Sequence, residues 1–161
     1  MEDVCLLTLQ VDAQSNSSVQ RRSAVVIGAG QAGLSAAYAL QQQGIQPLVL
    51  EKHRVAYAWD QQRWDSFCLV TPNWQCRLPD FPYSGDQPDG FMGKSSIVDY
   101  LQRFAQHVNA DLREGVAVSR LQPIVNGYRL DTSEGIIEAE HVIVATGGCL
   151  LYTSPSPRDC Q

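Results

Sequence analysis

The sequence lacks the features of several common protein classes. No apolar run approaches the roughly 18 residues that a membrane-spanning helix needs. Basic residues are in deficit, since 12 lysines and arginines stand against 17 acidic residues, for a formal net charge of −5. This balance argues against nucleic acid or an anionic membrane as a partner. The N-terminus also lacks the basic start and long apolar stretch of a signal peptide, so a cytoplasmic location is the default expectation.

The cysteines and histidines lack the spacing of a metal or redox site. Five cysteines are present, and no two of them form a Cys-x-x-Cys pair. Cys68 and Cys76 are too far apart in sequence to match a redox-active pair. The three histidines show no ligand spacing either. We therefore expect no metal site and interpret Cys5, Cys68 and Cys76 as buried free thiols.

The most informative feature present is a glycine-rich stretch, residues 24–33, which reads AVVIGAGQAG. Its apolar, β-branched start shows no alternation, which predicts a strand buried on both faces of a parallel sheet. In the turn that follows, Gly28 makes the tight bend and Gly30 lets the backbone approach a pyrophosphate. Gly33 lets the next helix pack closely against the strand. The stretch thus predicts a nucleotide-binding turn.

The residues after the turn supply the context that such a motif needs. A helix is predicted over residues 31–43, and its first N–H groups, starting at Gln31 and Ala32, would face the phosphates. Residues 45–50 form a second apolar run, and Glu51 closes it about twenty residues beyond the glycines, as a ribose-binding carboxylate should. Because a carboxylate repels a 2′-phosphate, an FAD-like or NAD-like adenosine is favoured over NADP at this site.

The next hundred residues depart from a simple run of strand–helix units. Residues 53–93 are rich in aromatics and prolines, which predicts long loops with short irregular pieces. Such a segment is either a functional loop or a hydrophobic cover over the sheet edge. Ser95 is predicted to be the N-cap of an amphipathic helix that reaches about His107.

Period-two alternation returns after this helix. A period-two pattern runs through Leu112, Glu114, Val116 and Val118, and three further segments have strand character, at residues 128–132, 135–139 and 141–145. Asn126-Gly127 is a strong hairpin-turn pair. These segments predict a short β-meander that leads back to a buried strand.

The order of these motifs resembles the FAD-binding half of flavin-containing monooxygenases over about residues 23–148. The motifs that carry the resemblance are GAGQAGL at 28–34, Glu51-Lys52, Trp59, PDFP at 79–82, Tyr100-Leu101 and VIVATG at 142–147. The run from Arg63 to Trp74 is most similar to a bacterial branch of such oxidoreductases. The resemblance implies an α/β fold, namely a Rossmann-like FAD/NAD(P)-binding three-layer domain with a β-meander, here truncated.

The resemblance also implies a set of cofactor-binding residues. Residues 145–147 would close the FAD domain near the flavin pyrophosphate, and Val118 would pack on the adenine. Glu51 would hold the adenosine ribose, while Lys52 and Trp59 would lie beside it or along the cofactor. The full expected set is Gly28, Gly30, Gln31, Ala32, Gly33, Glu51, Lys52, Trp59, Val118, Ala145, Thr146 and Gly147. No catalytic residue can be named, and Asn73 is only a candidate for the asparagine often found near the isoalloxazine.

Two segments depart from the family pattern. Many members carry two glycines before the tryptophan, where this chain has Ala56-Tyr57-Ala58, so we expect a less flexible turn. Residues 149–159 resemble the translation of a transposon-end adapter used in sequencing libraries; the alternative is a genuine proline- and serine-rich tail. The expected organisation is a flexible lead or over-extended start at 1–22, an FAD-binding domain at 23–148 and a non-native tail at 149–161.

The function that the resemblance implies belongs to a longer enzyme. Such an NAD(P)H-dependent flavin monooxygenase or oxidoreductase would move hydride from NADPH to FAD and one oxygen atom from O2 to a small substrate. The chain has no second Gly-x-Gly-x-x-Gly, so we expect the NADPH site in a missing C-terminal half and this fragment to be inactive alone. Two alternatives stay open: a flavin-dependent reductase or dehydrogenase without oxygenation, and a non-catalytic FAD-binding module. The substrate and the oligomeric state cannot be inferred from the sequence.

Overall fold

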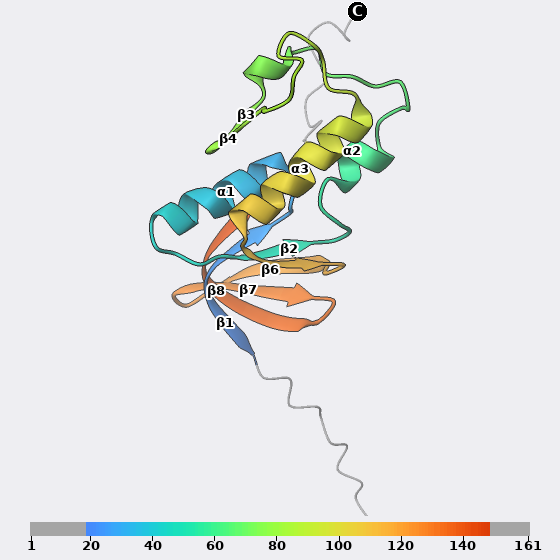
Figure 1. The fold of residues 1–161 in the computed structure, drawn as a ribbon. Coiled ribbons are helices and arrows are strands. Elements are labelled where there is room, and N and C mark those ends of the chain that lie inside the picture. Colours follow the sequence, from blue (N-terminus) through green and yellow to red (C-terminus); the bar gives the residue numbers. More distant parts are fainter. Residues whose placement is uncertain (1–18, 149–161) are drawn as a thin grey trace, which may run out of the picture.

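Residues 19–148, the part of the chain that this computed structural model describes, are organised around a six-stranded sheet of order β5-β2-β1-β8-β7-β6 (Figure 1). Its strands are β1 (Gln20–Ile27), β2 (Leu48–Glu51), β5 (Asp111–Glu114), β6 (Val118–Ile124), β7 (Gly127–Thr132) and β8 (Gly135–Val144). β1 pairs in parallel with β2 and β8, and β5 extends the parallel part beside β2. β6, β7 and the start of β8 form an antiparallel meander.

The remaining elements are helices and a short hairpin. The helices are α1 (Gln31–Gln42), α2 (Tyr57–Gln61) and α3 (Lys94–Val108). A 3₁₀ turn, η1 (Asn73–Gln75), precedes the two-stranded hairpin of β3 (Arg77–Leu78) and β4 (Phe81–Pro82). Between residues 19 and 148 no helix is long and apolar enough to cross a membrane. The same residues hold no cluster of three or more His, Cys, Asp or Glu side chains suited to a metal ion.

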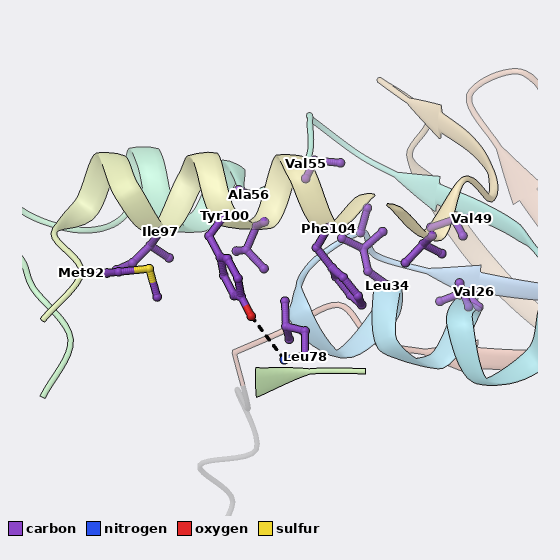
Figure 2. Close-up of a cluster of buried hydrophobic side chains, with 14 residues drawn as sticks. Val26, Leu34, Val49, Val55, Ala56, Leu78, Met92, Ile97, Tyr100 and Phe104 are labelled. Carbon is purple, nitrogen blue, oxygen red and sulfur yellow. Dashed lines mark hydrogen bonds between the residues drawn. The ribbon is translucent and has the colours of Figure 1, made fainter. Parts of the chain in front are cut away.

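The parallel strands are covered on both faces, which gives three layers. Val26 and Val49 pack against Leu34 of α1 and Phe104 of α3 (Figure 2). Their strand neighbours point the other way and pack against the meander; this second cluster contains Val25, Leu48, Leu50, Val116, Leu130, Ile137 and Ala139. The solvent-free position of Val25 and Val26, both 0% exposed, explains why the sequence of β1 shows no alternation. The expected α/β three-layer fold with a β-meander is confirmed.

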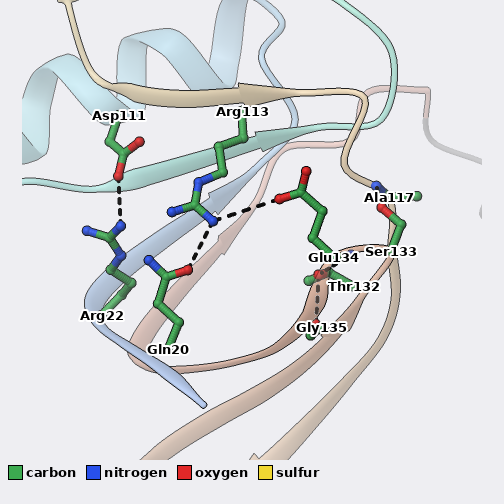
Figure 3. A network of polar contacts seen from close by, with 9 residues as sticks. All are labelled: Gln20, Arg22, Asp111, Arg113, Ala117, Thr132, Ser133, Glu134 and Gly135. Carbon is green, nitrogen blue, oxygen red and sulfur yellow. Dashed lines mark hydrogen bonds and ion pairs between the residues drawn. The ribbon is translucent and has the colours of Figure 1, made fainter. Parts of the chain in front are cut away.

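Polar side chains tie the amino ends of the parallel strands to the β7–β8 turn (Figure 3). Arg22 Nη2 donates to Asp111 Oδ2 at 2.8 Å, which links β1 to β5. Arg113 donates to Gln20 Oε1 at 3.0 Å and lies 3.9 Å from a carboxylate oxygen of Glu134. These contacts join the start of β1 to β5 and to the β7–β8 turn.

The local predictions for the first half are confirmed with small shifts. The helix predicted over 31–43 is α1, but the second strand begins at Leu48 rather than at residue 45. Residues 53–93 form loops with short irregular elements, as expected. The prediction of buried thiols is wrong here, because Cys68 is exposed and Cys76 is half-buried in these loops. β1 starts at Gln20, three residues before the predicted domain start. The predicted lead and tail otherwise lie outside the described residues.

Ser95 as the N-cap of the third helix is wrong. α3 begins at Lys94, its N-cap is Gly93, and no side chain bonds to its first N–H groups. The reason is a long-range contact, because the N–H of Lys94 donates to the carbonyl of Phe67 at 3.0 Å. A backbone partner from a distant loop thus replaces the side-chain cap that the local sequence predicts.

The alternating segment from Leu112 to Val118 is not one strand of the meander. It divides at Gly115, whose φ of +77° turns the chain between β5, a parallel edge strand, and β6. Residues 119–124 extend β6, and residues 135–144 are one strand rather than two. The hairpin at Asn126-Gly127 is confirmed, with a φ of +64° at Asn126. Period two alone does not say which neighbour a strand pairs with, which explains the error.

Candidate functional site

Three chain segments meet where β1, β2 and β8 end. The parallel register aligns Ile27 with Leu50, so the residues that follow, Gly28 and Glu51, emerge side by side. The N–H of Gly28 donates to the carbonyl of Leu50 at 2.7 Å. On the other side, the N–H of Ala145 donates to the carbonyl of Ile27 at 2.8 Å. The carboxyl edge of a parallel sheet is where such folds bind ligands.

Two of the three glycines are required by the backbone itself. Gly28 has a φ of +106°, and a Cβ there would lie 2.4 Å from the carbonyl oxygen of Ala145. A Cβ on Gly33 would lie 1.9 Å from the carbonyl oxygen of Gly28 and 3.4 Å from Val26 Cγ1. The tight bend predicted at Gly28 and the close helix–strand approach predicted at Gly33 are both confirmed.

Gly30 differs from its neighbours because nothing in the protein requires it. It is the N-cap of α1, with extended backbone angles that any residue can adopt, and no heavy atom lies within 4 Å of the position of a Cβ. Gln31 and Ala32, which follow it, are exposed. The first N–H groups of a helix have no acceptor inside the helix and carry a partial positive charge. The turn therefore leaves room for an anionic group in front of α1.

Glu51 is fixed beside this turn by two backbone donors. Its Oε2 accepts from the N–H of Ala29 at 2.8 Å, and its Oε1 accepts from the N–H of His53 at 2.9 Å. Each carboxylate oxygen has a second lone pair, so both can accept a further bond. Glu51 can thus present a positioned acceptor next to the glycine turn, which suits neighbouring ribose hydroxyls.

Trp59 lies on α2, close to the start of α1. Together with Gln31 it lines a cavity of about 190 Å³, whose other walls include Met92 and Tyr100. The indole ring lies 5.9 Å from the Phe67 ring, measured between centroids. Trp59 and the first residue of α1 therefore line the same cavity.

The remaining predicted residues occupy the edges of this region. Lys52 follows Glu51 with an exposed side chain. Val118 begins β6 and packs, half-buried, with Ile27 and Val142 against the meander-side core cluster. Thr146 and Gly147 follow β8 and are exposed. The structure brings together the glycine turn, Glu51 and Ala145, while Lys52 and Val118 have no described contact with the turn.

The expected cofactor-binding set omits two residues that shape this region. The hydroxyl of Tyr100 accepts from the N–H of Leu78 at 3.3 Å (Figure 2) and lies within bonding distance of the carbonyls of Cys76 and Phe81. It fastens the β3–β4 hairpin to α3, and burial raises the pKa of its phenol above the usual value. Glu114 Oε1 accepts from the N–H of Val55 at 2.7 Å, across 59 residues of sequence. No local pattern could reveal either contact; only the pairing of β2 with β5 brings Glu114 to this loop.

Known proteins share sequence similarity with most of this chain. The sequence model of the family described as pyridine nucleotide-disulphide oxidoreductase matches residues 25–156. A protein named "uncharacterized oxidoreductase CzcO-like" from Geobacillus kaustophilus is 38% identical over 124 residues, which cover 76% of this chain and 35% of that protein. The probable indole-3-pyruvate monooxygenase YUCCA8 of Arabidopsis thaliana is 29% identical, over 88% of this chain and 36% of that protein. The chain therefore spans little more than a third of the length of these relatives.

Solved structures share the fold. A flavin-containing monooxygenase from Stenotrophomonas maltophilia has a TM-score of 0.73 and 28% identity, covering 80% of this chain and 39% of that one. A bacillithiol disulfide reductase from Staphylococcus aureus has a TM-score of 0.72 at 20% identity, with 80% of this chain and 39% of that one covered. At that identity the second likeness concerns the fold alone.

Proposed function

The chain belongs to the pyridine nucleotide-disulphide oxidoreductase family, and from this premise we propose that residues 23–148 bind FAD as part of a flavin monooxygenase. Homology to FAD-dependent oxidoreductases supports the flavin, and the named monooxygenases among the similar proteins support the oxygenation. The bound FAD would supply the redox chemistry, since it accepts hydride and passes electrons on. The protein would supply binding and orientation.

The observation that carries the proposal is the open helix N-terminus at Gly30, with Glu51 fixed beside it. The N–H groups of Gln31 and Ala32 would bind the pyrophosphate. Glu51 would accept from the ribose hydroxyls with the lone pairs that Ala29 and His53 leave free. A residue larger than glycine at position 30 would fill the space into which the phosphates fit.

The complete reaction is proposed for a protein of the length of the relatives. NADPH would bind to a region beyond this domain and supply the two electrons through the flavin, and one oxygen atom of O2 would enter a small substrate while the other leaves as water. A flavin-dependent reductase or dehydrogenase that does not oxygenate is the alternative. As it stands, this chain would act as an FAD-binding module without turnover, because it has no second Gly-x-Gly-x-x-Gly for NADPH.

FAD binding by the 161-residue chain is the direct test. The purified protein is titrated into FAD, and quenching of flavin fluorescence measures the affinity. We expect one FAD per chain and no NADPH oxidation above that of free FAD. Absence of binding would overturn the proposed cofactor, and sustained NADPH oxidation would overturn the assignment as a module. In a protein of the relatives' length, isotopically labelled O2 separates the oxygenase, which incorporates label into product, from the reductase, which does not.

A further inference from the structure

The loop of residues 52–56, which joins β2 to α2, is held by the end of β5. The N–H of Gly115 donates to the carbonyl of His53 at 2.9 Å. The carboxylate of Glu114 accepts from the N–H of Val55 at 2.7 Å. Glu114 reaches this loop because it is the register partner of Glu51, the last residue of β2. The loop therefore takes its shape from a strand that lies 59 residues away in sequence.

The conformation of this loop needs such support. Ala56 has a φ of +61° and a ψ of +14°, the left-handed region that is unfavourable for a residue with a Cβ. Ala56 is also buried, at 4% exposed. Unfavourable backbone angles persist only where the surroundings fix them. On one side of Ala56 its carbonyl accepts from the N–H groups of Trp59 and Asp60 in α2. On the other side the contact is the bond between Val55 and Glu114.

The N–H of Val55 depends on Glu114 for its partner. Val55 is 5% exposed, Glu114 lies at the surface, and the hydrogen bond between them is partly buried. Without the carboxylate this donor loses its described acceptor, and the loop is free to move to find another. Movement here displaces Ala56 and the start of α2, which carries Trp59, and it also affects Lys52 at the other end of the loop.

We propose that Glu114 is a positioning residue, whose carboxylate holds the loop of residues 52–56 in the shape that binds the cofactor. It acts through Val55 and contacts no ligand itself. The two carboxylates thus have different roles. Glu51 bonds to the glycine turn and would bind the ligand, whereas Glu114 bonds to the loop of residues 52–56. The proposal rests on the proposed function only in naming FAD as the cofactor.

Two substitutions distinguish the length of the Glu114 side chain from its charge. Glu114→Gln removes the charge and keeps an oxygen at the same distance from the backbone, whereas Glu114→Asp keeps the charge and is one methylene shorter. Asp111→Asn is the matched control, because Asp111 lies on the same strand and contacts Arg22 rather than the loop. FAD affinity is measured by fluorescence quenching with the whole chain. Hydrogen exchange of the Val55 amide is measured without FAD.

We expect Glu114→Asp to weaken FAD binding about tenfold and to speed exchange at Val55, because the hydrogen bond is lost. Glu114→Gln stays within about threefold of the wild type, as does Asp111→Asn. Wild-type affinity in Glu114→Asp overturns the proposal, as does a loss in Glu114→Gln equal to that in Glu114→Asp. If the wild type binds no FAD, the proposed function fails. The rate of hydrogen exchange at the Val55 amide then tests by itself whether Glu114 holds the loop. Fast exchange confined to Glu114→Asp supports the role of Glu114, and equal exchange in all variants overturns it.

Discussion

Replacing Gly30 with alanine separates the binding role of the glycine turn from its structural role. The backbone of Gly30 has a φ of −81° and a ψ of −173°, and a Cβ there has no heavy atom within 4 Å. The folded protein therefore accommodates Gly30→Ala without strain. Alanine restricts the unfolded chain more than glycine does, which is worth about 0.4–1 kcal/mol, but it is a poorer N-cap for α1 by a similar amount, so we expect the free energy of unfolding to change by less than about 1 kcal/mol. FAD binding should weaken about tenfold, or about 1.4 kcal/mol, because the methyl group occupies space in front of α1.

Gly33→Ala is the matched comparison. Its Cβ would lie 1.9 Å from the carbonyl oxygen of Gly28, a backbone atom that cannot rotate away. Overpacking of this kind is unfavourable by about 3 kcal/mol, and the better helix propensity of alanine returns about 1 kcal/mol. The net loss in unfolding free energy is therefore about 2 kcal/mol.

Urea denaturation of the FAD-free proteins, followed by circular dichroism, and FAD titration of the same samples measure both effects. We expect Gly30→Ala to keep about the stability of the wild type and to bind FAD weakly. We expect Gly33→Ala to be less stable than the wild type even without FAD. Wild-type FAD affinity in Gly30→Ala would refute the placement of the phosphates at this residue. Marked destabilisation of Gly30→Ala would refute the open geometry of the turn.

Three further outcomes follow from the contacts described above. Tyr100→Phe should lower the unfolding free energy by about 1–3 kcal/mol in urea, because it leaves the buried N–H of Leu78 without an acceptor. Burial raises the pKa of Tyr100, so the fold favours its neutral phenol. The stability that this phenol contributes is complete below pH 10 and is lost as the pH rises through the folded-state pKa. Above pH 10, the free energy of unfolding should therefore fall more steeply for the wild type than for Tyr100→Phe. Ala56→Gly should reduce the effect of Glu114→Asp on FAD affinity, because glycine adopts the left-handed conformation without support; equal losses in both backgrounds would contradict this coupling.

Features that depend on neighbouring residues were predictable. The bend at Gly28 follows from a positive φ that glycine alone adopts readily, and α1 follows from the helix formers after it. The hairpin at Asn126-Gly127 is equally local. Prediction failed where a distant partner decided the outcome: the carbonyl of Phe67 replaced a side-chain cap at Lys94. The same holds for residues 112–118, where the turn at Gly115 assigns one period-two segment to two different strands.

The sequence by itself determined that a glycine turn, a helix and an acidic strand end follow one another, because backbone sterics and hydrophobic burial act over a few residues. It also determined the resemblance from which the flavin was inferred. Only the tertiary structure decided which strand lies beside β2, and with it the contact between Glu114 and Val55. Strands pair so that the whole sheet buries both of its faces. No short stretch of residues determines this burial, so the pairing cannot be predicted locally.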